Sequence, residues 1–252
     1  MRQFFEWEWF GIEFDSFCRP SSLSPPSPAF YETFYQILGA RCHTWTDLDP
    51  DFRAEKRAIA EFIFGRVESQ DIILSIGCGL GYVEHCLLEL SQGTLHLEVT
   101  EVAPAALKLI QKEIPASRVH VGFFPECIPT NLKYNLAIMS DIDYTMDQSS
   151  LAVLLHQIKG RLAPQGRCLL ISGGLDSPVS FWWKILRAAK KTAVAVLEAV
   201  GLLHRRQFWG WVRMQEEYQD AFSQAGYSEL RDGFIGKGPN PVGYYWIEAR
   251  LS

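Results

Sequence analysis

The sequence lacks the patterns that are typical of disulfide-rich, zinc-binding and membrane-spanning proteins. Its six cysteines are scattered along 252 residues and form no Cys-x-x-Cys pair, which favours reduced thiols over a disulfide framework or a zinc site. No stretch is apolar over the length that a membrane span needs. Acidic residues interrupt the apolar N-terminus, which has no signal-peptide cleavage site. We therefore expect a soluble cytoplasmic protein that holds no metal.

Positive charge is also scarce. The chain has 24 lysines and arginines against 29 acidic residues, for a formal net charge of -5. Proteins that bind nucleic acids are normally basic, so a nucleic-acid partner is not expected. The 48% hydrophobic and 21% charged content is ordinary for a globular protein. This length suits one large domain, or one domain with a cap.

The first fifty residues differ from the rest. They are rich in aromatic residues and are then broken by "RPSSLSPPSP", residues 19–28, whose prolines exclude a regular helix or a central strand. A helix is predicted over 29–38. We divide the chain into an N-terminal cap segment, 1–50, and a main domain, 51–252.

A repeating order of strands and helices begins near residue 54. Apolar strands are predicted at 72–76, 95–100, 118–122, 134–140 and 166–172, alternating with helices at 54–67, 82–90, 103–114 and 150–162. Such alternation indicates parallel strands joined by crossover helices. Helices at 177–201 and 214–226 follow, and then strands at 227–236 and 243–251, whose hairpin implies an antiparallel strand at the sheet edge. The predicted fold is α/β, with a doubly wound, mostly parallel seven-stranded Rossmann-like sheet, an antiparallel last strand and an N-terminal helical cap.

A glycine-rich loop follows the first of these strands. In "DIILSIGCGLGYVEHCLLEL", residues 71–90, a buried strand runs through Gly77, Gly79 and Gly81 into a helix. Glu101 stands 20 residues beyond Gly81 at the end of the next strand, where an acid can hydrogen-bond the hydroxyls of a ribose. The loop and the acid together predict a nucleoside site.

The loop does not fit a dinucleotide well. The third small position of the dinucleotide pattern is Tyr82 here, which crowds the approach of a pyrophosphate to the helix N-terminus. No phosphate-binding loop of the nucleotide-triphosphate type is present in the sequence. An NAD-dependent oxidoreductase is therefore the less favoured alternative.

Four segments resemble, in order, the motifs of the class I S-adenosylmethionine-dependent methyltransferases. They are "ILSIGCGLGYVE", "VTEVAPAAL", "YNLAIMSDIDY" and "RLAPQGRCLLIS". The resemblance implies S-adenosyl-L-methionine as cofactor, with Glu101 on the ribose and Val102 beside the adenine. The cofactor residues that it implies are Ser75, Gly77, Cys78, Gly79, Gly81, Glu101, Val102, Phe123, Phe124 and Ser140.

Two positions depart from that family. Ser75 stands where the family usually has an acid that helps to hold the ammonium group of the cofactor, and Phe123 and Phe124 stand where an acid often meets the adenine. These departures keep open a rival hypothesis, in which the protein binds the cofactor for a regulatory or structural purpose without methyl transfer.

Four residues are candidates for the chemistry. Asp141 and Tyr144 follow the fourth strand, near the methyl end of the cofactor by family analogy, and His43 and His204 lie in segments expected to cover the pocket. Asp143 and Asp147 are interpreted as solvated loop residues. A calcium loop is excluded because Met146 stands where its glycine is needed.

The remaining segments suggest how the pocket is enclosed. Residues 182–213 are basic. The helix predicted at 177–201 is interpreted as amphipathic and packed on the core, with a lid or a membrane-surface contact by 182–213 as the alternative. Trp209 and Trp211 suit a pocket wall. The aromatic N-terminus up to Leu38 is predicted to be a lid that brings Tyr31 and Tyr35 near the ligands, or else a surface that pairs two subunits. The predicted function is methyl transfer to a small molecule such as a sugar or secondary metabolite, with oxygen slightly favoured over nitrogen.

Overall fold

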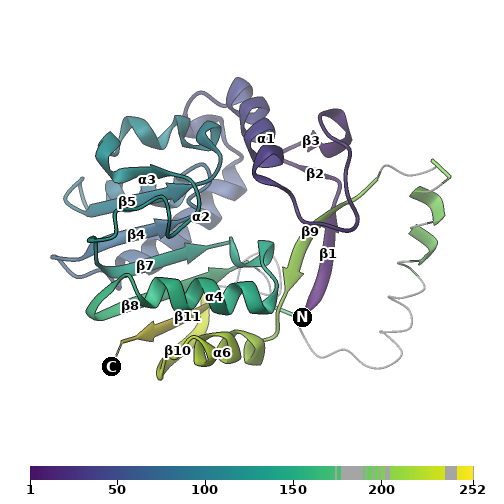
Figure 1. Ribbon diagram of the computed structural model, residues 1–252. Coiled ribbons are helices and arrows are strands. Elements are labelled where there is room, and N and C mark those ends of the chain that lie inside the picture. The colour runs from purple at the N-terminus through teal and green to yellow at the C-terminus, as the bar shows by residue number, and fades with distance from the viewer. Residues whose placement is uncertain are drawn as a thin grey trace.

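The centre of the computed structural model is a seven-stranded sheet with the order β10-β11-β8-β7-β4-β5-β6 (Figure 1). The structure describes residues 1–173, 175–176, 190, 192–194, 196–198, 200–201, 205–235 and 243–251. The parallel strands are β4 (Ile72–Ile76), β5 (His96–Glu101), β6 (Val119–Val121), β7 (Tyr134–Ser140) and β8 (Leu162–Ser172). The predicted doubly wound, mostly parallel sheet is confirmed.

The last strand, β11 (Tyr244–Arg250), runs antiparallel to β8, as predicted. It is not the outermost strand, because β10 (Glu229–Ile235) pairs with its other side and forms the edge. Burial explains this order. Tyr245, Ile247 and Ala249 of β11 are fully buried, whereas β10 carries charged residues that an edge strand can keep in water.

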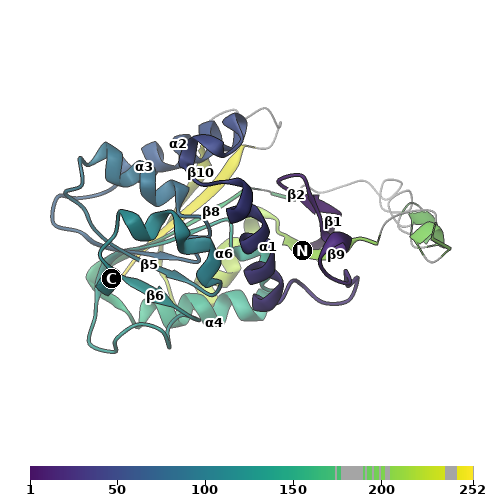
Figure 2. The same cartoon turned by 90° about the horizontal axis from the view of Figure 1, so that it is seen from above.

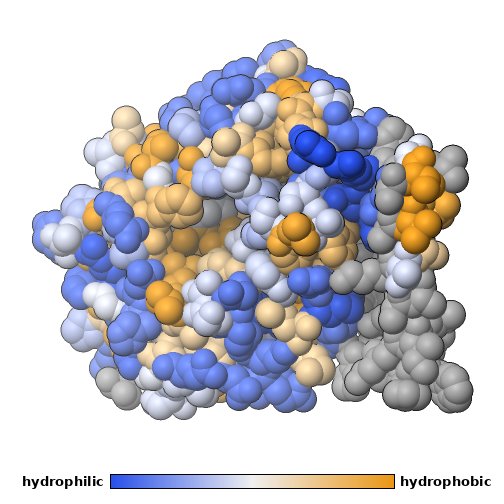
Figure 3. All heavy atoms as spheres, turned by 45° about the vertical axis from the view of Figure 1, so that its right-hand side comes forward, coloured by the Kyte–Doolittle hydropathy of each residue, from blue (hydrophilic) through white to orange (hydrophobic). Residues whose placement is uncertain are grey.

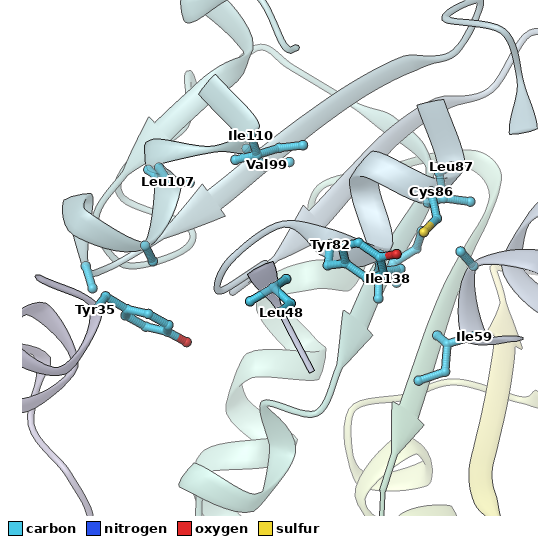
Figure 4. Close-up of a cluster of buried hydrophobic side chains, with 14 of the residues drawn as sticks. Tyr35, Leu48, Ile59, Tyr82, Cys86, Leu87, Val99, Leu107, Ile110 and Ile138 are labelled. Atoms are coloured by element: carbon cyan, nitrogen blue, oxygen red, sulfur yellow. The ribbon is translucent and has the colours of Figure 1, made fainter. Parts of the chain in front are cut away.

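Helices cover both faces of the sheet. Helices α2 (Pro50–Phe64) and α3 (Tyr82–Leu90) lie on one face, and α4 (Gln148–Lys159) and α6 (Gln215–Gln224) lie on the other (Figure 2). Successive strand residues point to opposite faces, so Ile73 packs in the first hydrophobic cluster and Leu74 in the second. Figure 4 shows part of the first cluster, with Ile59 of α2, Leu87 of α3 and Ile138 of β7.

The predicted helix at 103–114 is wrong. Two short 3-10 turns replace it, η3 (Pro104–Lys108) and η4 (Ile110–Lys112), and a third, η5 (Ala116–Arg118), follows. Hydrogen bonds to α1 (Pro28–Arg41) hold this segment in place. The Ala105 amide donates to Glu32 at 3.0 Å, and the Lys108 ammonium group donates to the Gly39 carbonyl at 2.9 Å. A regular crossover helix is therefore not required here.

The N-terminal segment combines helix and strand. β1 (Arg2–Glu6) pairs antiparallel with β9 (Gln207–Val212), and β2 (Glu8–Trp9) pairs with β3 (Ile12–Glu13). The turns η1 (Phe14–Ser16) and η2 (Trp45–Asp47) flank α1. Ser27 caps the start of α1, because its hydroxyl accepts a hydrogen bond from the Phe30 amide. β9 follows the helix predicted at 177–201 and lies in a stretch for which the sequence predicted no strand. Residues 182–189 lie outside the described part of the chain.

The N-terminal aromatic residues belong to the first hydrophobic cluster. Trp9 stacks on Phe34 of α1 with ring centroids 4.9 Å apart, and Phe14 stacks on Trp209 of β9 at 5.0 Å. The boundary between a cap segment, 1–50, and a main domain, 51–252, stays a prediction, because both sides share this one cluster. None of the helices in the described residues is long and apolar enough to cross a membrane.

Candidate active site

The glycine loop between β4 and α3 is left-handed at each glycine. The φ angles of Gly77, Gly79 and Gly81 are 66°, 57° and 80°, values that side chains other than glycine rarely adopt. A Cβ on Gly77 would lie 2.8 Å from Ile142, and one on Gly81 would lie 2.6 Å from Ile110. At Gly79 a Cβ would meet the Tyr35 hydroxyl at 3.1 Å. Packing therefore requires the outer glycines, whereas a Cβ on the middle one would meet only the end of the Tyr35 side chain.

Glu101 at the end of β5 holds this loop. Its carboxylate accepts hydrogen bonds from the amides of Gly79 at 2.9 Å, Val102 at 2.8 Å and Ala103 at 3.0 Å. Burial raises the pKa of Glu101, and the three amides oppose that rise. One oxygen accepts from Gly79 alone, so it can still accept a hydroxyl of a ligand.

A cavity of about 870 Å³ lies over this end of the sheet, within the range of small-molecule sites. Figure 3 shows a hollow on this face with hydrophobic residues gathered around it. The cavity is lined by every residue that was predicted to bind the cofactor: Ser75, Gly77, Cys78, Gly79, Gly81, Glu101, Val102, Phe123, Phe124 and Ser140.

Two of the four predicted catalytic residues also line the cavity. Asp141 forms an ion pair with Lys56 of α2 and accepts from the Gly173 amide at 2.6 Å, and Tyr144 stands beside it. His43 is exposed in the loop after α1, where its amide donates to Asp47, and it is not among the described residues that line the cavity. The prediction that His43 covers the pocket is therefore wrong, because its loop leaves this side chain exposed to solvent. His204 lies outside the described residues.

Sequence reasoning missed Glu84, which lies in the first turn of α3. Its side chain is 2% exposed, accepts a hydrogen bond from the Ser75 hydroxyl and lines the cavity. The other carboxylate oxygen has no hydrogen-bond partner in the described part of the structure. Acids are common in the first turn of a helix, because a negative charge there interacts favourably with the helix dipole. The sequence pattern alone therefore does not distinguish a buried acid from a solvated one.

The interpretation of Asp143 as a solvated loop residue is wrong. Asp143 is 1% exposed behind the cavity wall, where it accepts from Tyr218 at 2.6 Å and Arg213 donates to its backbone carbonyl at 2.9 Å. Burial raises the pKa of Asp143 to about 6. Asp147 caps α4 by accepting from the Ser150 amide at 2.8 Å, which is a structural role.

Aromatic residues form much of the remaining wall. They come from the N-terminal segment, from the turn after β7, from β9 and from β11: Trp9, Tyr31, Tyr35, Tyr144, Trp209 and Tyr244. Trp211 packs on Phe208 with ring centroids 4.9 Å apart and does not belong to the described lining. The N-terminal segment thus helps to enclose the cavity.

The fold is similar to those of solved methyltransferases. A putative O-methyltransferase from Nostoc punctiforme matches with a TM-score of 0.57 and 18% identity, covering 94% of this chain and 64% of that chain. The mitomycin 7-O-methyltransferase MmcR matches with a TM-score of 0.58 and 19% identity, covering 90% of this chain and 58% of that chain. Human N-acetylserotonin methyltransferase, solved in complex with SAM, matches with a TM-score of 0.54 and 17% identity, covering 90% of this chain and 57% of that chain.

This chain spans roughly three fifths of the length of those three proteins. No protein-family model and no curated protein matches the sequence. The similarity in structure to the protein from Nostoc punctiforme covers nearly the whole of this chain. The chain therefore has the Rossmann-like fold of the class I S-adenosylmethionine-dependent methyltransferases.

Proposed function

We propose that the protein transfers a methyl group from S-adenosylmethionine to a small-molecule acceptor, and that oxygen is favoured over nitrogen as the methylated atom. The observation that carries this proposal is the shared cavity, which brings the glycine loop and Glu101 together with Asp141 and an aromatic wall. When bound, the cofactor supplies a methyl group on a positively charged sulfur, and the sulfur becomes neutral once the methyl group has left.

The residues on the β5 side of the cavity fit the adenosine part of the cofactor. Glu101 keeps one carboxylate oxygen with room for a ribose hydroxyl. Val102, Phe123 and Phe124 offer an apolar surface for the adenine ring. The glycine loop lets the backbone approach the ligand closely.

The residues beyond β7 fit the acceptor. The Asp141 carboxylate, held by Lys56 and the Gly173 amide, can accept a hydrogen bond from an acceptor hydroxyl and take its proton as the oxygen–methyl bond forms. Trp9, Tyr31 and Trp209 would exclude water from that end. This wall favours an apolar, planar metabolite with a hydroxyl group over a sugar. The names of two similar structures, which are O-methyltransferases, agree with oxygen as the target.

Calorimetry with S-adenosylhomocysteine tests the cofactor site. Glu101→Gln should weaken binding about 10- to 100-fold, because hydrogen bonds to a charged group contribute roughly 1.5–3 kcal/mol. Glu89→Gln is the matched control, since Glu89 is half exposed on α3 and pairs with Arg57. Unchanged affinity in Glu101→Gln would remove this residue from the site, and binding of NAD in place of S-adenosylhomocysteine would favour the oxidoreductase.

Transfer of a labelled methyl group to a panel of planar hydroxylated compounds tests the reaction. Asp141→Asn should lower the rate by at least 10-fold if Asp141 accepts the proton. Cofactor binding without transfer to any acceptor, and without slow hydrolysis of the methyl donor, would support the rival hypothesis of a non-catalytic protein.

A further inference from the structure

The cavity is acidic. Four acidic side chains line it, Glu55, Glu84, Glu101 and Asp141, against one basic side chain in the described lining, Lys56. All four acids are hydrogen-bonded or paired, and Glu84 accepts from the Ser75 hydroxyl. Glu101 accepts from three amides, Asp141 pairs with Lys56, and Glu55 accepts from the Tyr244 hydroxyl at 3.2 Å. Glu84 is the described lining acid that retains an unpartnered, buried carboxylate oxygen.

An unpartnered carboxylate oxygen in a buried site is costly unless a donor or a cation reaches it. Lys56 lies close enough to influence Glu84 but is held in its ion pair with Asp141. A positively charged ligand that donates hydrogen bonds would therefore complete this part of the cavity.

We propose that Glu84, oriented by Ser75, binds the α-ammonium group of the methionine part of the cofactor. The proposal rests on the proposed function. An ammonium group has three donors, whereas the sulfonium has none, so the missing hydrogen bond of Glu84 fits the former. Glu84 thereby supplies the acid that the sequence lacks at position 75.

The strand order supports this placement. The sheet places β4 between β5 and β7. Glu101 ends β5, and Asp141 follows β7. Ser75 lies on β4 between them, and its hydroxyl donates a hydrogen bond to Glu84 of α3. If the ribose lies at Glu101 and the methyl group faces Asp141, Ser75 and Glu84 offer a polar wall between these two ends for the methionine tail.

Binding at this position would displace a proton. Burial raises the pKa of Glu84 to about 7, while the Ser75 hydrogen bond and Lys56 lower it and Glu101 adds to the rise. The Cys78 thiol of the loop also faces this carboxylate. Without ligand, Glu84 is therefore partly protonated near neutral pH, and an ammonium group would drive the proton off.

The test is calorimetry at pH 6.5 in buffers that differ in ionisation enthalpy. The two ligands are S-adenosylhomocysteine and its analogue in which a hydrogen replaces the α-amino group. Wild-type protein should release a fraction of a proton on binding the first ligand and none on binding the second. Glu84→Gln, which retains the acceptor for Ser75, should abolish the release and weaken S-adenosylhomocysteine binding about 10- to 100-fold, and should leave the affinity for the analogue unchanged.

Glu89→Gln, on the exposed side of the same helix, should behave as wild type. Equal affinity and equal proton release in wild type and Glu84→Gln would overturn the assignment while the proposed function stands. Failure of wild-type protein to bind either ligand would instead refute the proposed function. If Glu84→Gln does not fold, the difference in proton release between the two ligands on wild-type protein still decides the question.

Discussion

Among single residues, the glycines of the loop between β4 and α3 are required for different reasons. A side chain at Gly81 would overlap Ile110 of η4, whereas a side chain at Gly79 would meet only the end of Tyr35. Both positions also carry the cost of a left-handed backbone, about 1–2 kcal/mol for a residue with a Cβ.

We expect Gly81→Ala to destabilise the ligand-free protein by about 2–4 kcal/mol, since overpacking adds to the backbone strain. Gly79→Ala should cost only about 1–2 kcal/mol of stability and should lower affinity for S-adenosylhomocysteine more than tenfold. Urea unfolding and calorimetry measure the two effects. Equal destabilisation by both variants would mean that Gly79 serves the turn and not the ligand.

The buried acid Glu84 should make stability depend on pH. Its pKa is raised from 4.5 to about 7 in the folded protein, so the folded state binds more protons than the unfolded state between these values. Stability therefore falls as pH rises through this range. Glu84→Gln should be more stable than wild type at pH 8, by about 1–3 kcal/mol, and the difference should disappear near pH 4.5. Melting temperatures measured across this range would contradict the assignment if the two curves were parallel.

Between secondary-structure elements, Arg213 joins the end of β9 to η6 (Asp143–Thr145). It is fully buried, donates to the Asp143 and Met146 carbonyls, and lies 3.4 Å from the Asp143 carboxylate. These bonds hold the turn that carries Tyr144 into the cavity. The end of β9 therefore supports the wall of the site.

Removal of one partner from the buried Arg213–Asp143 pair should strongly destabilise the folded protein. Arg213→Leu should lower the free energy of unfolding by about 3–5 kcal/mol, because it leaves the Asp143 carboxylate buried without its cation. Arg250→Leu is the control, since Arg250 is 44% exposed and lies 3.9 Å from Glu248, and it should cost at most about 1 kcal/mol. Similar losses in the two variants would show that the Asp143 pair contributes little.

In the protein as a whole, the N-terminal segment is both part of the core and part of the cavity wall. Trp9 and Tyr35 line the cavity, while Phe14 and Phe34 are fully buried in the cluster that includes α2 and α3. Complete removal of residues 1–38 would expose Trp209 and its neighbours. The lid hypothesis therefore needs a test on the intact chain.

Hydrogen exchange provides that test. If α1 closes over a bound ligand, its amides should exchange several-fold more slowly once S-adenosylhomocysteine is added, because ligand binding suppresses local opening. The amides of α6, which lies on the opposite face of the sheet and is not part of the described cavity lining, should change much less. Exchange in α1 that is indifferent to the ligand would leave this helix as a fixed wall.

Local pattern was sufficient to predict most of the fold and the glycine loop. The apolar strands, the glycines after β4 and the 20-residue offset of Glu101 are properties of neighbours in the chain, and backbone geometry relates such short patterns directly to strands, turns and helices. Every residue predicted to bind the cofactor lines the cavity for this reason.

Long-range packing accounts for what the pattern did not show. The burial of Glu84 and Asp143, the outward position of His43, the pairing of β1 with β9 and the place of β10 outside β11 each depend on segments far apart in the sequence. An acid, a histidine or an apolar run has the same local pattern whether water or another segment covers it. Its environment is set only when the chain folds, because burial and strand pairing are interactions between distant residues.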